Sequence, residues 1–205
     1  MTRSDFESLF QRALVSRGEA YVMAESELRE SPESAPVLRG HLGDPDPIAR
    51  LAASVMLESV EARAPDFEEV PRYFAELERY VARTVAGTPP ITGVVANLTT
   101  RFGGRLTGFL ALRLVRQPQT GWRALVALAY LDRHKDPATT EAIIRFAAQT
   151  RERPLQAIAA RVLVGLGDPA LAQKINAERD RLAAEGGSLP AVVASLAAPS
   201  GHTVA

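Results

Sequence analysis

Residues 41–57 read His-Leu-Gly-Asp-Pro-Asp-Pro-Ile-Ala-Arg-Leu-Ala-Ala-Ser-Val-Met-Leu, and they combine a helix end, a turn and the start of an amphipathic helix. Gly43 is suited to the left-handed residue that closes a helix. Asp44 or Asp46 can cap the next helix, and Pro47 stands where its missing N–H costs nothing. Beyond the turn, apolar residues recur at helical spacing at Ile48, Leu51, Ala52, Val55 and Met56. The stretch therefore predicts a helix, a turn and a second helix.

The same pattern returns later in the chain. Asp136-Pro137 and Asp168-Pro169 lie 32 residues apart, and each opens a new apolar segment at helical spacing. The spacing of Pro47, Leu51, Ala52-Ala53, Val55 and Met56 is repeated by Pro154, Ile158, Ala159-Ala160, Val162 and Leu163. A period of this length suits one helix pair, and such pairs bury their apolar faces only when they stack on one another.

The turn residues resemble those of a known repeat family. Asp46-Pro47, Arg50 and the paired Ala52-Ala53 resemble the turn and second helix of a HEAT-type repeat, including the bilin-lyase-like variety. The later copy departs from this pattern, because Ala157 stands where the first copy has Arg50. The resemblance implies an all-α fold, a right-handed α-solenoid of about five stacked antiparallel helix pairs whose concave face binds a partner.

Two other segments bear on the fold. Ser4 and Glu7 have the form of a capping box, which predicts a first helix up to about Ser16. The Val, Ile and Thr residues of 91–100 are compatible with a strand, but we expect a helix, since an isolated strand leaves its backbone groups unpaired.

We assign residues 1–187 to the solenoid. Residues 188–205, rich in Ala, Pro and Gly, are expected to form a mobile tail, although Val192–Leu196 could dock.

Composition excludes several functional classes. The absence of cysteine rules out disulfides, a thiolate nucleophile and cysteine metal ligands. No apolar run approaches the length of a membrane span and the amino terminus does not read as a signal peptide, so we expect a cytoplasmic protein without membrane contact. His41, His134 and His202 lack metal-ligand spacing. The sequence predicts no metal, no cofactor and no catalytic residue.

Charge is unevenly distributed along the chain. Residues 1–80 contain 16 acidic and 9 basic side chains, whereas residues 81–161 contain 4 acidic and 12 basic ones. From Arg79 to Leu131 there is no Asp or Glu, although this stretch contains seven arginines. A basic middle section of this kind favours an acidic partner.

The candidate binding residues come from this acid-free stretch. If 106–115 is helical, Arg105, Arg113 and Arg116 project within about 80° of one another, with Phe109 between them. Arg101, Trp122 and Arg123 lie at the adjoining turns. Arginines interleaved with aromatic residues suit an acidic protein groove, or the phosphates and bases of a nucleic acid. A third reading is that these arginines pair with the excess carboxylates of the first 80 residues.

The HEAT-like resemblance also admits an enzyme branch, the alkylpurine DNA glycosylases, which implies a basic concave surface with tryptophans and a catalytic aspartate. Trp122 is the single tryptophan, and the nearest aspartate, Asp132, lies outside the basic stretch near a predicted helix end. The sequence therefore favours a non-catalytic protein-interaction module, an adaptor or scaffold that binds an acidic protein. The alternative is a nucleic-acid-binding protein related to the glycosylases. The oligomeric state does not follow from the sequence.

Overall fold

A computed structural model describes residues 1–62, 66–83, 87–116 and 121–197, and the regular structure within these ranges is helical. The all-α fold class predicted from the sequence is confirmed. The helices are α1 (Arg3–Val15), α2 (Glu19–Glu30), α3 (Ala35–Gly40), α4 (Pro47–Ala62), α5 (Asp66–Val81), α6 (Ile91–Phe102), α7 (Thr107–Arg116), α8 (Gly121–His134), α9 (Thr140–Gln149), α10 (Arg153–Leu166), α11 (Leu171–Ala184) and α12 (Ala191–Ala194).

The local signals place most helices correctly. The Val, Ile and Thr segment is helix α6, as expected. The capping box of α1 is the exception, because it is formed by Thr2 and Asp5 in place of Ser4 and Glu7. The Thr2 Oγ1 accepts the Asp5 N–H at 3.3 Å, and the Asp5 carboxylate accepts the Thr2 N–H at 2.6 Å. Thr2 and Asp5 have the same three-residue spacing as Ser4 and Glu7. The earlier pair caps the helix because the helix begins at Arg3, two residues before the expected start.

The turn before α4 keeps its predicted caps but not its predicted helix end. Gly43 belongs to a short 3-10 turn, His41–Gly43, and does not adopt a left-handed conformation. The prediction for Gly43 was therefore wrong, since a 3-10 turn closes α3 without a positive φ. Asp46 Oδ1 accepts the Ile48 N–H at 3.1 Å, and Asp44 Oδ1 accepts the Asp46 N–H at 2.8 Å. Asp46 thus caps the start of α4, whereas Asp44 closes the turn that precedes it.

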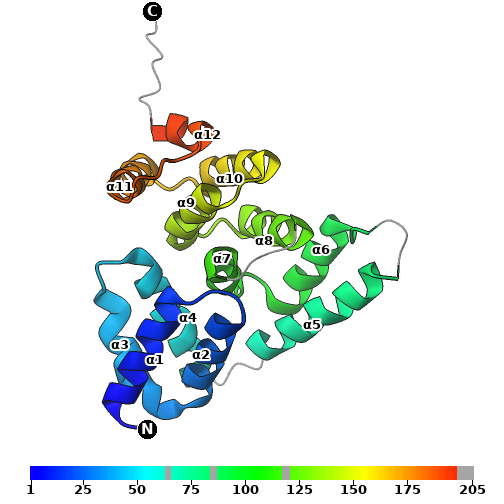
Figure 1. Cartoon of the computed structure of the whole chain (residues 1–205). Coiled ribbons are helices and arrows are strands. Elements are labelled where there is room, and N and C mark those ends of the chain that lie inside the picture. Colours follow the sequence, from blue (N-terminus) through cyan, green and yellow to red (C-terminus); the bar gives the residue numbers. More distant parts are fainter. Residues whose placement is uncertain (63–65, 84–86, 117–120, 198–205) are drawn as a thin grey trace, which may run out of the picture.

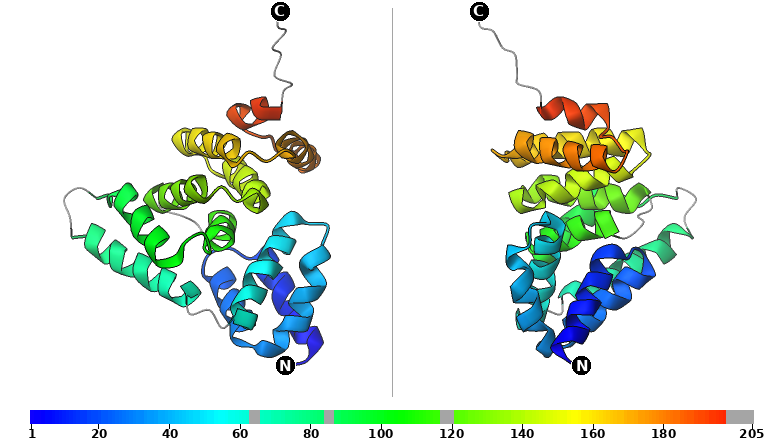
Figure 2. Two further views of the ribbon diagram at one scale, coloured as in Figure 1. Left: turned by 180° about the vertical axis from the view of Figure 1, so that it is seen from behind. Right: turned by 60° about the vertical axis from the view of Figure 1, so that its left-hand side comes forward.

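The helices pack in two parallel series. Helices α1 to α4 form a block, and α4 contacts α7, which contacts α9, which in turn contacts α11. On the other side, α6 contacts α8, α8 contacts α10 and α10 contacts α12. Figure 1 shows α1 and α12 at opposite ends of this arrangement, with α5 and α6 projecting to one side. The views of Figure 2 show α7 to α12 as successive layers above the N-terminal block.

The segment after residue 187 differs from the expected mobile tail. Residues 191–197 are helical, and α12 packs against α10 and α11. Val193 is fully buried and Leu189 is buried as well. Within Val192–Leu196, for which the sequence left docking open, Val193 is buried and Leu196 packs against the core, whereas Val192 is exposed. Residues 198–205 of the predicted tail lie outside the described part of the chain.

Among the helices within the described ranges, none is long and apolar enough to cross a lipid bilayer.

Candidate functional site

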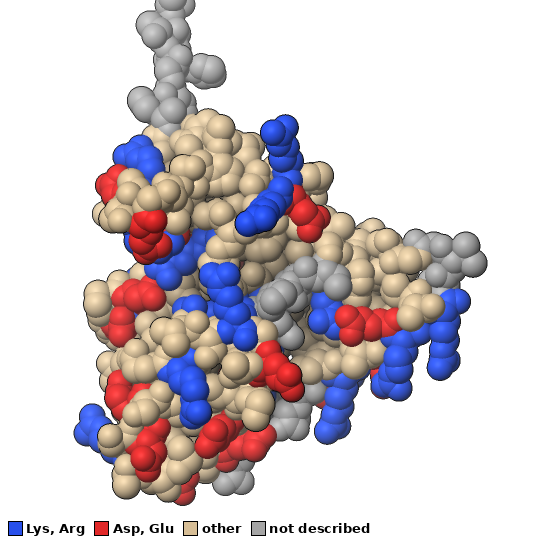
Figure 3. Space-filling view, viewed as in Figure 1, with Lys and Arg blue, Asp and Glu red and all other residues tan. Residues whose placement is uncertain are grey.

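The predicted binding residues do not share one surface. Arg105 precedes α7, which begins at Thr107, so the helical angle expected between Arg105, Arg113 and Arg116 does not apply. Arg113 faces a pocket against α5, whereas Arg116 faces a different pocket at the end of α7. Figure 3 shows acidic and basic side chains interspersed over this face of the molecule, with basic ones also on the projecting part that α5 and α6 form. The tertiary structure thus divides the basic stretch among several sites.

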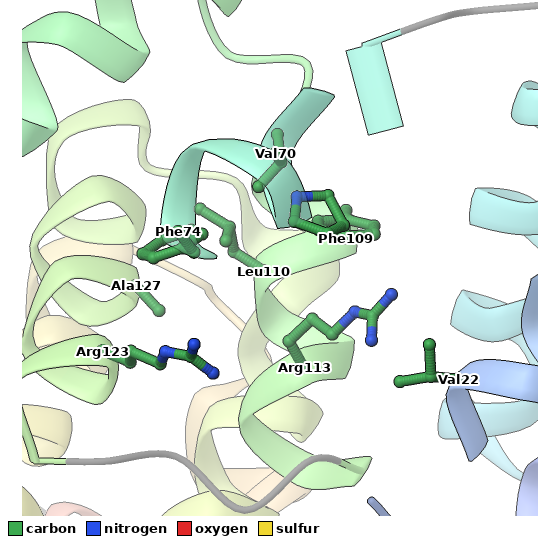
Figure 4. Close-up of a pocket in the computed structure, with 9 residues that line it drawn as sticks. Val22, Val70, Phe74, Phe109, Leu110, Arg113, Arg123 and Ala127 are labelled. Carbon is green, nitrogen blue, oxygen red and sulfur yellow. The ribbon is translucent and has the colours of Figure 1, made fainter. Parts of the chain in front are cut away.

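Three of the predicted residues, Phe109, Arg113 and Arg123, line one pocket with a volume of about 160 Å³, which we call the α5–α7 pocket. Its other lining residues come from α2, α5, α7 and α8 and are all apolar: Val22, Val70, Pro71, Phe74, Leu110 and Ala127. In Figure 4 the side chains of Arg113 and Arg123 extend toward the pocket from neighbouring helices, and Val70, Phe74 and Leu110 lie together beside them. The pocket therefore combines an apolar wall with two guanidinium groups.

Arg113 is buried and its charge is balanced from within the fold. Its Nη2 donates to Glu25 Oε2 at 2.5 Å, and Glu25 also accepts a hydrogen bond from the Tyr21 hydroxyl at 3.0 Å. The guanidinium lies 4.7 Å from the ring centroid of Phe109 and 5.5 Å from that of Tyr21. Burial, reinforced by the Glu25 carboxylate, raises the pKa of Tyr21 well above its ordinary value. Arg113 thus joins α7 to α2 and forms a fixed part of the pocket wall.

Arg123 is held differently. Its guanidinium lies 5.9 Å from the ring centroid of Phe74 and 5.7 Å from that of Trp122. These two rings are 5.8 Å apart and tilted by 30°. The carboxylate that pairs with Arg123 is that of Glu78, whose side chain is 42% exposed. Arg123 is thus oriented by aromatic contacts, while its acidic partner remains accessible to water.

The other basic residues of the stretch lie outside this pocket. Arg101 pairs with Glu69 at 2.8 Å in a solvent-exposed ion pair and stacks 5.4 Å from the ring centroid of Phe102. Arg105 is exposed in the turn between α6 and α7. The reading in which the middle arginines pair with carboxylates of the first 80 residues is therefore correct for Arg101, Arg113 and Arg123.

The lining of the α5–α7 pocket is made of apolar and basic side chains. It has no His, Asp or Glu among its described lining residues. His41 contacts Glu7 and Asp44, and His134 contacts Thr99, so both lie in structural contacts elsewhere. No group of three or more His, Asp or Glu side chains in the described ranges is arranged to hold a metal ion. The groups that are present favour a ligand that is partly apolar and partly anionic.

Sequence reasoning missed the wall supplied by α5 and α2. Val70, Phe74 and Val22 fall on apolar helix stripes, and such stripes indicate core packing without showing which helix covers them. One signal in the sequence could have pointed to Phe74. It lies in an amphipathic helix that also carries Glu76 and Glu78, and these acidic residues are complementary in charge to the basic, acid-free stretch.

Comparison of the chain with protein-family models, with curated protein sequences and with solved structures gives no match.

Proposed function

We propose that this chain is a non-catalytic protein-interaction module that binds an acidic, partly apolar segment of a partner protein at the α5–α7 pocket. The observation that carries the proposal is the setting of Arg123. Its guanidinium borders an apolar pocket and packs against Phe74 and Trp122, and it pairs with the accessible Glu78.

The ion pair of Arg123 is open to water on its acidic side. The Glu78 side chain is 42% exposed, so an acidic side chain of a partner can approach Arg123 from solvent and replace Glu78. The partner's carboxylate would then sit beside Val70, Phe74 and Leu110, where a neighbouring Leu or aromatic side chain gains affinity by burial. Arg113 keeps Glu25 as its buried counterion, so the pocket wall stays in place during this exchange.

A HEAT-like solenoid is the second part of the proposal. The succession α4, α7, α9, α11 and the succession α6, α8, α10, α12 support it, because stacked repeats contact their neighbours in this order. The Asp-Pro turns support it as well. Asp46, Asp136 and Asp168 each accept the N–H of the residue two positions on, at 3.1, 3.0 and 2.9 Å. Repeat proteins of this kind bind partners along extended surfaces.

The test uses Trp122, the single tryptophan, as a reporter beside the pocket. Synthetic peptides with one Leu or Phe flanked by Asp and Glu are titrated while Trp122 fluorescence is followed, and matched peptides carry Asn and Gln instead. We expect the acidic peptides to bind, and Arg123→Gln to weaken binding about tenfold or more, as for loss of a charge-assisted hydrogen bond. Phe74→Ala should weaken it too. Arg133→Gln, on an exposed residue at the end of α8, is the matched control.

Two results would overturn the proposal. One is equal binding of acidic and neutral peptides, and the other is unchanged affinity in Arg123→Gln. A parallel titration with single-stranded DNA examines the alternative function. Nucleic-acid binding whose log–log salt slope is about one unit per phosphate contact, with no peptide binding, would favour that alternative. The internal ion pairs of Arg101, Arg113 and Arg123 reduce the number of cations that phosphates can reach.

A further inference from the structure

A second pocket, with a volume of about 230 Å³, lies at the end of α7 and is distinct from the α5–α7 pocket. We call it the Arg17–Arg116 pocket after the two basic residues that line it. Its walls come from the α1–α2 turn, the last turn of α7, the end of α9 and the start of α10.

A backbone contact brings the two arginines together from distant parts of the chain. The Gly18 N–H donates to the carbonyl oxygen of Arg116 at 2.9 Å, which fixes the α1–α2 turn against the end of α7. Gly18 has a φ of 63°, a conformation that favours glycine. The turn therefore places Arg17 beside Arg116, although the two residues are far apart in the sequence.

Neither arginine forms an ion pair with a carboxylate in the part of the chain that the structure describes. The amide of Gln149 orients Arg17, with its oxygen 3.3 Å from Arg17 Nη2 and its nitrogen 3.2 Å from the Val115 carbonyl oxygen. Glu152 lies on the lining but is exposed and forms no ion pair with either arginine in the described part. Within the described residues, the two guanidinium groups thus line one small pocket with no carboxylate at ion-pair distance from either, although Glu152 lines the same pocket.

The neighbouring cation does not relieve this excess of positive charge. Arg145 is close enough to Arg116 to act on its ionisation, but its own charge is matched by Asp46 at 2.6 Å and by Glu178 at 3.5 Å. Burial of the guanidinium lowers the pKa of Arg116, Tyr21 and Asp46 oppose this effect in part, and the charges of Arg145 and Arg17 add to it. A partly buried guanidinium group such as that of Arg116, next to a second cation, is unfavourable unless an anion compensates it.

We propose that the Arg17–Arg116 pocket binds a small phosphate monoester with an apolar organic group. Two guanidinium groups match the two negative charges of the phosphoryl group, and their planar donors suit its oxygens. A carboxylate would compensate only one of them. Leu114, Phe146 and Leu155 line the same pocket and supply an apolar wall for the organic part. Because Arg17 and Arg116 do not line the α5–α7 pocket, this site is independent of the proposed peptide site.

The test is calorimetric titration of the full chain with phenyl phosphate, inorganic phosphate and benzoate at constant ionic strength. We expect phenyl phosphate to bind more tightly than either of the other two. Arg116→Gln should weaken phenyl phosphate binding about tenfold or more, and Arg17→Gln should do the same. Arg17 is exposed, so its variant keeps the fold even if Arg116→Gln is destabilised. Arg161→Gln, on the exposed face of α10, is the matched control and should bind as wild type does.

Three outcomes would overturn the proposal. Phenyl phosphate and benzoate could bind equally well, which would show that the phosphoryl group is not recognised. Arg17→Gln and Arg116→Gln could both retain wild-type affinity, which would place the ligand elsewhere. Arg161→Gln could weaken binding as much as the other two variants, which would indicate a non-specific effect of positive charge.

Discussion

At the scale of single residues, Glu25 illustrates how a buried charge holds this fold together. Its side chain is inaccessible to solvent, and it accepts hydrogen bonds from Tyr21 and Arg113. Both carboxylate oxygens are therefore satisfied, one by each partner. Such a network stabilises the fold only while it is complete, because removing one partner leaves a buried charge uncompensated.

We predict that Glu25→Ala lowers the free energy of unfolding by about 3–5 kcal/mol, since the charge of Arg113 is then left in a largely buried site. Urea denaturation followed by circular dichroism measures this change. Glu27→Ala, two positions away and exposed, is the control and should stay close to wild type. The double variant Glu25→Leu/Arg113→Met should regain much of the loss, because both charges are removed. Equal unfolding midpoints for Glu25→Ala and Glu27→Ala would contradict the role assigned to Glu25.

Asp168 gives a prediction about pH. Burial alone would raise the pKa of its carboxyl group, but hydrogen bonds from Lys174, Thr140 and the Ala170 N–H outweigh burial and lower it. A carboxyl group with a lowered pKa in the folded state stabilises the protein above its unfolded-state pKa, near 3.8. This stabilisation is lost as the pH falls through the lower, folded-state value.

Asp168→Asn should therefore have a lower Tm than wild type at neutral pH, and the difference should shrink as the pH falls below about 3.8. Thermal unfolding across this pH range measures both effects. Asp180→Asn is the control, because the side chain of Asp180 is 75% exposed. A Tm for Asp168→Asn that equals wild type at neutral pH would show that the contacts of Asp168 do not stabilise the fold.

At the scale of elements, the close approach of α4 and α7 depends on one glycine. A Cβ atom added at Gly108 would lie 2.8 Å from Val55 Cγ2 and 3.5 Å from Leu51 Cδ1. Valine is stiff about its first side-chain torsion, so Val55 has little freedom to move aside. The contact joins the N-terminal block to the later helices, since α4 is the helix of the block that packs on α7.

Gly108→Ala should lower the free energy of unfolding by about 1–3 kcal/mol through overpacking. The measurement is chemical denaturation of the variant. Val55→Ala in the same chain should recover part of the loss by making room for the added methyl group.

Gly93→Ala is the control, because the nearest atom to its added Cβ is 3.8 Å away. In that exposed part of α6, alanine should stabilise the helix by up to about 1 kcal/mol. If Gly108→Ala matches Gly93→Ala, the helices are not as close as described.

At the scale of the whole molecule, the two helix series need a cover at their carboxyl end. The segment of residues 189–197 provides it, with Val193 fully buried and Leu189 nearly so. Stacked helices expose an apolar face wherever the stack ends, so a capping element is required for stability. This segment is thus a structural part of the fold and not an appendage.

Deleting residues 188–205 should lower the free energy of unfolding by about 2–5 kcal/mol. Each buried aliphatic side chain contributes about 1.5–3 kcal/mol, and part of this is lost because the unfolded chain already buries some apolar surface. Deleting residues 198–205 is the matched control, because it retains the described contacts of α12. Urea unfolding of the two shortened chains gives the comparison. The same midpoint for both would mean that residues 188–197 contribute nothing to stability.

Local sequence determined the helices of this protein and most of their ends. Apolar residues at helical spacing predict α4 and α10, and the Asp-Pro pairs predict turns. Asp46 caps α4, Asp136 caps a short 3-10 helix, and Asp168 accepts the Ala170 N–H in the turn before α11. These features depend on residues within a few positions of one another. The error at Thr2 and Ser4 has the same local origin, because two equivalent capping pairs overlap there.

Only the tertiary structure decided which residues meet. Glu25 and Arg113 are 88 positions apart, and Asp46 and Arg145 are 99 positions apart. Helical periodicity determines which face of a helix is buried, but not which other helix covers that face or which charge lies opposite. The excess of carboxylates in the first 80 residues therefore indicated that partners existed for the middle arginines. Helix packing determined which charges pair and formed the α5–α7 pocket beside Arg123. It also placed Arg17 and Arg116 in one pocket, where neither forms an ion pair with a carboxylate of the described residues.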